Sequence, residues 1–133
     1  MTTHLSKFIG SQQLSAIQSA MRGEEHAFFF EKIADLELLV STMPKTYDQD
    51  GMGDEAIVSL HYFRGGADWY ITERDSDPDG SGQLQAFGLA DLFGDGGELG
   101  YISIPEILAV GAELDFYFTP TTLGSVRQKR STQ

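Results

Sequence analysis

The sequence predicts an α+β fold, in which two N-terminal helices pack on a four- to five-stranded, mostly antiparallel sheet, with one short helix before the last strand. Apolar residues within positions 11–43 recur at spacings of three and four, which is typical of amphipathic helices. Within positions 56–118, short runs of β-branched and aromatic residues alternate with glycine-rich loops, which is typical of strands. Helices followed by a meander of strands make up an α+β arrangement.

The 133 residues are expected to form a single domain, with a helical part at 11–43, a sheet part at 56–118 and a flexible tail at 127–133. Hydrophobic residues make up 41% of the chain and charged residues 22%, a balance that argues against wholesale disorder. The absence of cysteine excludes disulfides, thiolate metal sites and cysteine nucleophiles, and it fits a reducing compartment. The sequence shows neither a signal-peptide core nor an apolar run of about 20 residues, so a cytoplasmic protein without membrane contact is expected.

The helical part is predicted to form one helix over 11–21 and a longer one over 24–43. In the longer helix, apolar residues return at steps of 4, 3, 4 and 3, which predicts one continuous buried face made of Phe29, Ile33, Leu36, Val40 and Met43. The apolar residues beside this face are Phe28, Phe30, Leu38 and Leu39. They are expected to pack in the core, with a homodimer contact as the alternative. Pro44 ends the helix, because a residue before proline avoids the α region.

Five strands are predicted, over 57–63, 68–74, 83–92, 99–103 and 113–118. Gly65 and Gly66 between the first two strands predict a tight antiparallel hairpin turn. In the second strand, Trp69 and Ile71 share a face that we assign to the core, and Glu73 is placed at the rim of that face.

Two local signals refine the second half of the sheet. Gly88 lies inside the third strand, where a glycine marks a bulge or a close approach of another backbone. The segment from Ser103 to Glu106 has serine, proline and glutamate at the positions of a capping box, which predicts the start of a short helix. Gly111 is expected to end that helix before the last strand.

The negative charge of the chain is concentrated in its sheet part. Between Thr46 and Phe118 there are 15 Asp and Glu residues against two basic ones, Arg64 and Arg74, a balance of −13 within a chain of net charge −11. Such a surface repels nucleic-acid backbones, so direct binding to DNA or RNA is not expected. It suits a basic protein partner or mimicry of a phosphate backbone, and the alternative is that the acidity only maintains solubility.

An Asp-rich segment at 75–80 begins like a calcium-binding loop, with Asp75, Asp77 and Asp79 at alternate positions before a glycine. The same register fails further on, because Ala86 stands where a bidentate glutamate is needed. Asp, Pro and Gly are also favoured in turns for conformational reasons. A hairpin loop is therefore preferred, no cofactor is expected, and weak Ca²⁺ binding by the three aspartates is kept as an alternative.

Candidate binding residues cluster at the predicted strand ends: Trp69, Glu73, Asp91, Glu98 and Tyr101. Carboxylates in a partly apolar pocket can have split pKa values and perform general acid–base chemistry. The alternative is that these carboxylates bind the backbone amides of the two glycine-rich loops. The three histidines lack metal-ligand spacing and no serine lies in a nucleophile elbow, so no catalytic residue is assigned and an enzyme is not favoured.

The motifs DWYITERD, QAFGLADL and ELGYISIPEI resemble those of domain-of-unknown-function family 2958. The resemblance covers roughly residues 46–118 and rests on Trp69, Thr72, Glu73, Phe87, Gly88, Asp91, Leu92, Glu98, Leu99, Gly100, Tyr101 and Ser103. It implies small bacterial proteins often carried by plasmids, phages and integrative elements, and it implies no reaction. Association with mobile DNA is a context rather than a physical argument.

The sequence and the resemblance together suggest a small, acidic, non-catalytic interaction protein of mobile-element origin. Its partner is expected to be a basic protein, and an anti-defence inhibitor, such as an anti-CRISPR or antirestriction protein, fits this description. One alternative is a small enzyme or ligand-binding domain that uses the carboxylate cluster. A weak divalent-metal-binding module is the other. Both a monomer and a homodimer are compatible with the sequence.

Overall fold

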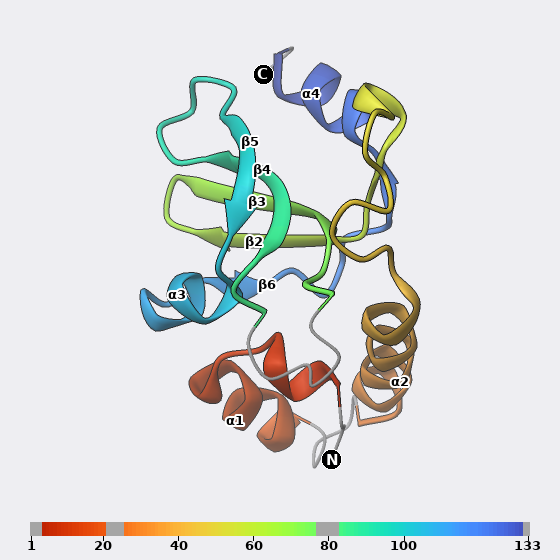
Figure 1. Cartoon of the computed structure of the whole chain (residues 1–133). Coiled ribbons are helices and arrows are strands. Elements are labelled where there is room, and N and C mark those ends of the chain that lie inside the picture. Colours follow the sequence, from red (N-terminus) through yellow and green to blue (C-terminus); the bar gives the residue numbers. More distant parts are fainter. Residues whose placement is uncertain (1–3, 21–25, 77–82, 132–133) are drawn as a thin grey trace.

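A computed structural model of the chain describes residues 4–20, 26–76 and 83–131, and it confirms the α+β prediction (Figure 1). Five antiparallel strands form the main sheet in the order β5-β4-β3-β2-β6. These strands are β2 (Leu60–Arg64), β3 (Ala67–Glu73), β4 (Ala86–Asp91), β5 (Glu98–Ile102) and β6 (Glu113–Leu114). A small second sheet pairs β1 (Ile57–Val58) with β7 (Thr121–Thr122). The helices are α1 (Ser11–Ala20), α2 (His26–Thr42), α3 (Ile104–Ala109) and α4 (Leu123–Ser131), with 3₁₀ turns η1 (Leu5–Lys7) and η2 (Gly53–Glu55).

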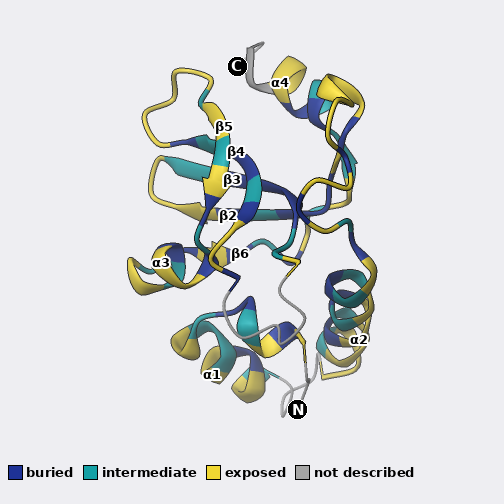
Figure 2. Ribbon diagram, viewed as in Figure 1, coloured by how far each residue is buried: buried dark blue, intermediate teal, exposed yellow. Residues whose placement is uncertain are grey.

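The main sheet is covered on both faces, as Figure 1 shows. Helices α1, α2 and α3 lie on one side and contribute to a large core with Leu60, Trp69 and Ile71 of the sheet. On the other side, α4 and β1 form a smaller core around Tyr70 and Leu89. Buried residues are concentrated in β3 and β4, whereas the loop between β4 and β5 is exposed (Figure 2). The edge of the sheet at β5 is therefore mostly exposed, and only its last residue, Ile102, is buried in the large core.

The predicted apolar face of α2 is confirmed, since Ile33, Leu36, Val40 and Met43 are buried and Phe29 is partly buried against the same core. The expectation that the additional apolar residues also pack in the core holds for Leu39 but is wrong for Phe28, Phe30 and Leu38, which are 38%, 66% and 64% exposed. The reason is geometric, because a helix of this kind turns only one stripe of side chains toward the core.

The two strands of the hairpin pair as the glycine turn predicts. Arg64 pairs with Ala67 around Gly65 and Gly66, and Gly65 has a φ of 56°, the left-handed conformation that such a two-residue turn requires. The first predicted strand is interrupted at Ser59, so that β1 pairs with β7 while β2 pairs with β3 and β6.

A β-bulge in β3 determines the face on which Glu73 lies. Ile71 pairs with Gly88, but Glu73 pairs with Phe87, the adjacent residue of β4, so that Thr72 is the extra residue. A shift of one residue turns a side chain to the other face of a sheet. The prediction that Glu73 lies at the rim of the core face is therefore wrong, because the bulge moves it to the opposite face.

The C-terminal part differs most from the prediction. The last strand of the main sheet ends at Leu114, because the Asp115 side chain accepts a hydrogen bond from the Tyr117 amide and turns the chain. Residues 127–131, predicted to be part of a flexible tail, belong to helix α4. The Thr122 hydroxyl accepts a hydrogen bond from the Ser125 amide at 3.2 Å, which caps the start of this helix. The predicted cap of α3 is confirmed, since Ser103 accepts from the Glu106 amide at 3.3 Å.

Tyr62 provides a test of the large core. It is fully buried, its hydroxyl donates to the Phe8 carbonyl oxygen, and burial raises its pKa well above the ordinary tyrosine value. The unfolded chain loses this proton near pH ~10 while the folded protein keeps it, so stability that is present below pH ~10 is lost as the pH rises further. We expect Tyr62→Phe to cost about 1 kcal/mol at neutral pH, because the Phe8 carbonyl loses its donor. Between pH ~9 and ~11 the variant should lose less stability than the wild type, as measured by urea unfolding.

Candidate functional site

The structure places the five predicted site residues on two faces of the sheet. Direct cross-strand partners project from the same face. Glu73 pairs with Phe87 and Phe87 with Tyr101, so these three side chains form one row. Trp69 pairs with Ala90 and Ala90 with Glu98, and these side chains project from the other face. Glu73 and Tyr101 therefore lie in one row, whereas Trp69 is buried in the large core and Glu98 is exposed on β5.

Asp91 is fully buried at the end of β4 and holds the β4–β5 loop. Its Oδ1 accepts a hydrogen bond of 2.8 Å from the Gly94 amide. Gly97, in the same loop, has a φ of 77°, and a Cβ there would lie 2.6 Å from the Ala90 carbonyl oxygen. The hydrogen bond to Gly94 agrees with the alternative that Asp91 binds a backbone amide of a glycine-rich loop.

A small cavity of about 230 Å³ lies beside Glu73, and we call it the Glu73 pocket. It is lined by Thr46, Tyr47, Gln49, Asp50, Gly51, Gly53, Ala56, Thr72, Glu73, Phe87, Leu99 and Leu123. Glu73 is only 5% exposed, and its Oε1 accepts a hydrogen bond of 2.7 Å from the Tyr47 amide. The 44–55 segment after α2 thus forms one wall of the cavity and the β3–β4–β5 row forms the other.

Tyr47 lines this pocket in a backbone conformation that is unusual for a non-glycine residue, with a φ of 78°. Its amide is held by Glu73, and its hydroxyl is hydrogen-bonded to the Tyr101 hydroxyl. This hydrogen bond, followed by burial, raises the pKa of Tyr101. Tyr101 also meets Phe87 edge-to-face at 5.9 Å. The three rings make an aromatic border between the pocket and the edge of the sheet.

The edge of the sheet beyond Tyr101 is open, since no other described strand pairs with the outer side of β5. Apolar and acidic side chains surround a shallow hollow of about 360 Å³ at this edge. We define the β5-edge surface by its exposed members Leu92, Phe93, Asp95, Glu98, Leu99 and Tyr101. Phe93 is 86% exposed and Tyr101 is 55% exposed. Contiguous exposed apolar side chains with a polar border are typical of interaction sites.

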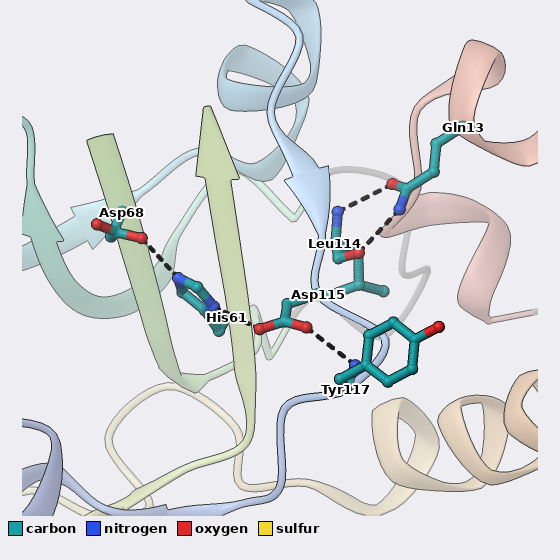
Figure 3. A network of polar contacts seen from close by, with 6 residues as sticks. All are labelled: Gln13, His61, Asp68, Leu114, Asp115 and Tyr117. Carbon is teal, nitrogen blue, oxygen red and sulfur yellow. Dashed lines mark hydrogen bonds and ion pairs between the residues drawn. The ribbon is translucent and has the colours of Figure 1, made fainter. Parts of the chain in front are cut away.

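A second polar cluster was not predicted and lies toward the opposite edge of the sheet (Figure 3). It consists of His61, Asp68 and Asp115, and we call it the His61 network. The two ring nitrogens of His61 lie 2.8 Å from Asp68 Oδ1 and 2.9 Å from Asp115 Oδ2. The ring stacks on Tyr70 at 4.6 Å. Both ring nitrogens are therefore within hydrogen-bond distance of a carboxyl oxygen. With both nitrogens engaged, His61 is placed to link β2, β3 and the segment after β6 rather than to accept a proton from a substrate.

The predicted calcium loop can be followed only in part, because Asp77 and Asp79 lie outside the described residues. Asp75 accepts a hydrogen bond from the Gln85 amide at 3.0 Å, as expected at the base of a hairpin loop. Across residues 4–20, 26–76 and 83–131, no three His, Asp or Glu side chains are grouped as metal ligands.

Comparison with known proteins then gives one positive result. A family model described as "Protein of unknown function (DUF2958)" matches residues 32–125, which is more than half of the chain. The chain belongs to this family. No curated protein and no solved structure matches it. The DUF2958 match reaches from α2 into α4 and extends further in both directions than the predicted resemblance over 46–118. It includes the Glu73 pocket, the β5-edge surface and the three residues of the His61 network.

Within the described part of the chain, no helix has the length and apolar character needed to cross a membrane.

Proposed function

We propose that the protein is a non-catalytic interaction protein that binds a basic protein partner through the β5-edge surface. The observation that carries this proposal is the open edge strand, whose exposed Leu99 and Tyr101 line one hollow together with Phe93 of the preceding loop. An exposed apolar edge strand is a template for pairing with a strand of another chain, and stable proteins usually protect it. Gly100 at the centre of β5 leaves the backbone accessible, because a Cβ at this position would meet nothing within 4 Å.

The charge of the domain supports a basic partner. Asp95 and Glu98 lie among the apolar residues of the β5-edge surface. They are two of the 15 acidic residues that give the range from Thr46 to Phe118 its balance of −13. Complementary charge accelerates association and selects among partners. Proteins that bind nucleic acids carry basic surfaces that complement an acidic one, so we prefer a nuclease or another nucleic-acid-binding effector as the partner. More specifically, we propose that the protein inhibits a host defence enzyme.

The positions of the acidic residues support a non-catalytic role. General acid–base catalysis needs two groups within reach of one substrate. Asp91 holds the β4–β5 loop, Glu73 faces a separate cavity, and Glu98 projects from the other face of the sheet. The three carboxylates thus do not converge on one substrate position.

The test is capture of the partner at low salt with the purified protein as bait. We expect a protein of basic isoelectric point to be retained at about 50 mM salt and released by about 500 mM, because the Debye length then falls from roughly 14 to 4 Å. The double variant Phe93→Ala/Tyr101→Ala should weaken binding by about 30-fold or more, as expected for loss of exposed aromatic anchors.

The matched control removes two exposed apolar side chains from elsewhere, in the variant Val110→Ala/Tyr117→Ala. This control should bind like the wild type. Equal loss in both double variants, or capture that is insensitive to salt, would contradict the proposal, and so would the absence of any captured basic protein.

A further inference from the structure

The Glu73 pocket contains a buried carboxylate without a counter-charge. Glu73 is 5% exposed, and none of the described basic side chains forms an ion pair with it. Lys45 and Arg74, which lie near Glu73, do not form an ion pair with it either. Removing a carboxylate from water costs several kcal/mol unless an opposite charge or hydrogen bonds compensate. The local hydrogen bonds must therefore be counted.

Those hydrogen bonds leave acceptor capacity unused. The two carboxylate oxygens offer about four acceptor positions. The Tyr47 amide fills one of them at 2.7 Å. The Thr72 hydroxyl lies 3.2 Å from Oε2, but it also lies 3.1 Å from the Phe87 carbonyl oxygen, and its single proton can serve only one of the two. Glu73 thus faces the cavity as an under-satisfied anion.

The walls of the pocket suit a cation on an aliphatic chain. The lining includes the aromatic residues Tyr47 and Phe87, one from each wall, and the aliphatic residues Ala56, Leu99 and Leu123. Aromatic faces attract ammonium groups, most strongly where water is excluded. The side-chain amide of Gln49 does not compete for this role, because it is fully engaged with the backbone of Ile57 and Thr72.

From this combination we propose that the Glu73 pocket binds a primary alkylammonium group, with the cation at Glu73 and the alkyl chain against the apolar wall. The volume of about 230 Å³ is below the range of roughly 300–1,000 Å³ of pockets for drug-sized ligands, so it admits one short chain. A lysine side chain of another protein and a free small amine share this chemistry. The inference is independent of the partner proposed for the β5-edge surface.

The test titrates the protein with n-butylammonium and follows backbone amide shifts by NMR. We expect saturable shifts at residues 46–51, 72–73 and 87, with a dissociation constant near 1 mM, which corresponds to about −4 kcal/mol. The neutral probe n-butanol should bind at least about tenfold more weakly, because it cannot supply a charge to a desolvated carboxylate. Capped lysine (N-acetyl-lysine methylamide) distinguishes the sources: binding at least as tight as that of n-butylammonium indicates a protein side chain, and binding of n-butylammonium alone indicates a free amine.

Two variants assign the effect to the pocket. Glu73→Gln keeps the shape and one acceptor but removes the charge, and it should abolish the preference for n-butylammonium over n-butanol. Phe87→Leu keeps the wall apolar while removing a ring, and it should weaken n-butylammonium binding by severalfold, which gives a second reading if Glu73→Gln does not fold. The matched control is Glu55→Gln, which removes one exposed negative charge outside the pocket and should change nothing.

Three results would overturn the proposal. Equal binding of n-butanol and n-butylammonium would show a purely apolar cavity. Shifts spread over the acidic surface, equally reduced by Glu55→Gln, would show counter-ion condensation. The absence of saturation at tens of millimolar probe would show that the cavity does not admit the ligand.

Discussion

Gly88→Ala is expected to destabilise the protein by about 3 kcal/mol or more, the largest effect of any single methyl group added to the sheet. The reason is the contact of Gly88 with the backbone of β3, where a Cβ would lie 2.0 Å from the Tyr70 carbonyl oxygen and 3.0 Å from the Ile71 Cα. Backbone atoms of a paired strand cannot move aside as a flexible side chain can. The bulge at Thr72 must therefore rearrange, and the loss should appear as a lower midpoint in urea unfolding.

The adjacent strand offers a matched control. Gly100 of β5 is the direct partner of Gly88, and a Cβ at this position meets nothing within 4 Å. Gly100→Ala should therefore be neutral or slightly stabilising, because alanine restricts the unfolded chain more than glycine does. If the two variants had the same stability, the close approach of β3 and β4 at the bulge would be refuted.

His61→Gln is expected to cost about 1–3 kcal/mol, because it removes two side-chain hydrogen bonds and leaves Asp68 and Asp115 without their shared partner. The side chains of His61, Asp68 and Asp115 are 14%, 24% and 25% exposed, so water replaces these bonds only in part. Glutamine cannot donate to both aspartates in the same arrangement, and it loses the stacking on Tyr70. The free energy of unfolding, measured in urea at neutral pH, gives the result.

His4→Gln serves as the control, since His4 is an exposed histidine outside the network. It should leave stability within about 0.5 kcal/mol of the wild type. A His61→Gln variant as stable as this control would mean that the contacts of His61 with Asp68 and Asp115 contribute nothing, as is common for polar pairs on the surface.

The core of the fold could be predicted from local periodicity. Steps of three and four placed Ile33, Leu36 and Val40 on one face of α2, and the glycine turn set the register of β2 and β3. These features depend on residues that are near one another in the sequence. The position of Glu73 could not be predicted in the same way, because the bulge arises from pairing with β4 and only Gly88 indicated it.

The His61 network and the Glu73 pocket also depend on contacts between residues that are far apart in the sequence. Asp68 pairs with Phe63, diagonally across the hairpin from His61, and could have been inferred from the register, whereas Asp115 lies 54 residues from His61. Tyr47 and Tyr101, whose hydroxyls meet beside the Glu73 pocket, are also 54 residues apart. Contacts of this range depend on how the loop at 44–55 and the segment after β6 close on the sheet, and composition and periodicity do not encode that closure.

The measurement that tests the central claim most directly is backbone hydrogen exchange of the protein with and without the captured basic partner. Amides in fluctuating or unpaired segments exchange quickly and become protected when a partner pairs with them. We predict that protection on binding is concentrated in β5, residues 98–102, and in the preceding loop at 92–95, and that it is lost in Phe93→Ala/Tyr101→Ala. Protection at the exposed face of α2 around Phe30 and Leu38, with no change in β5, would contradict the proposal that the partner binds at this edge.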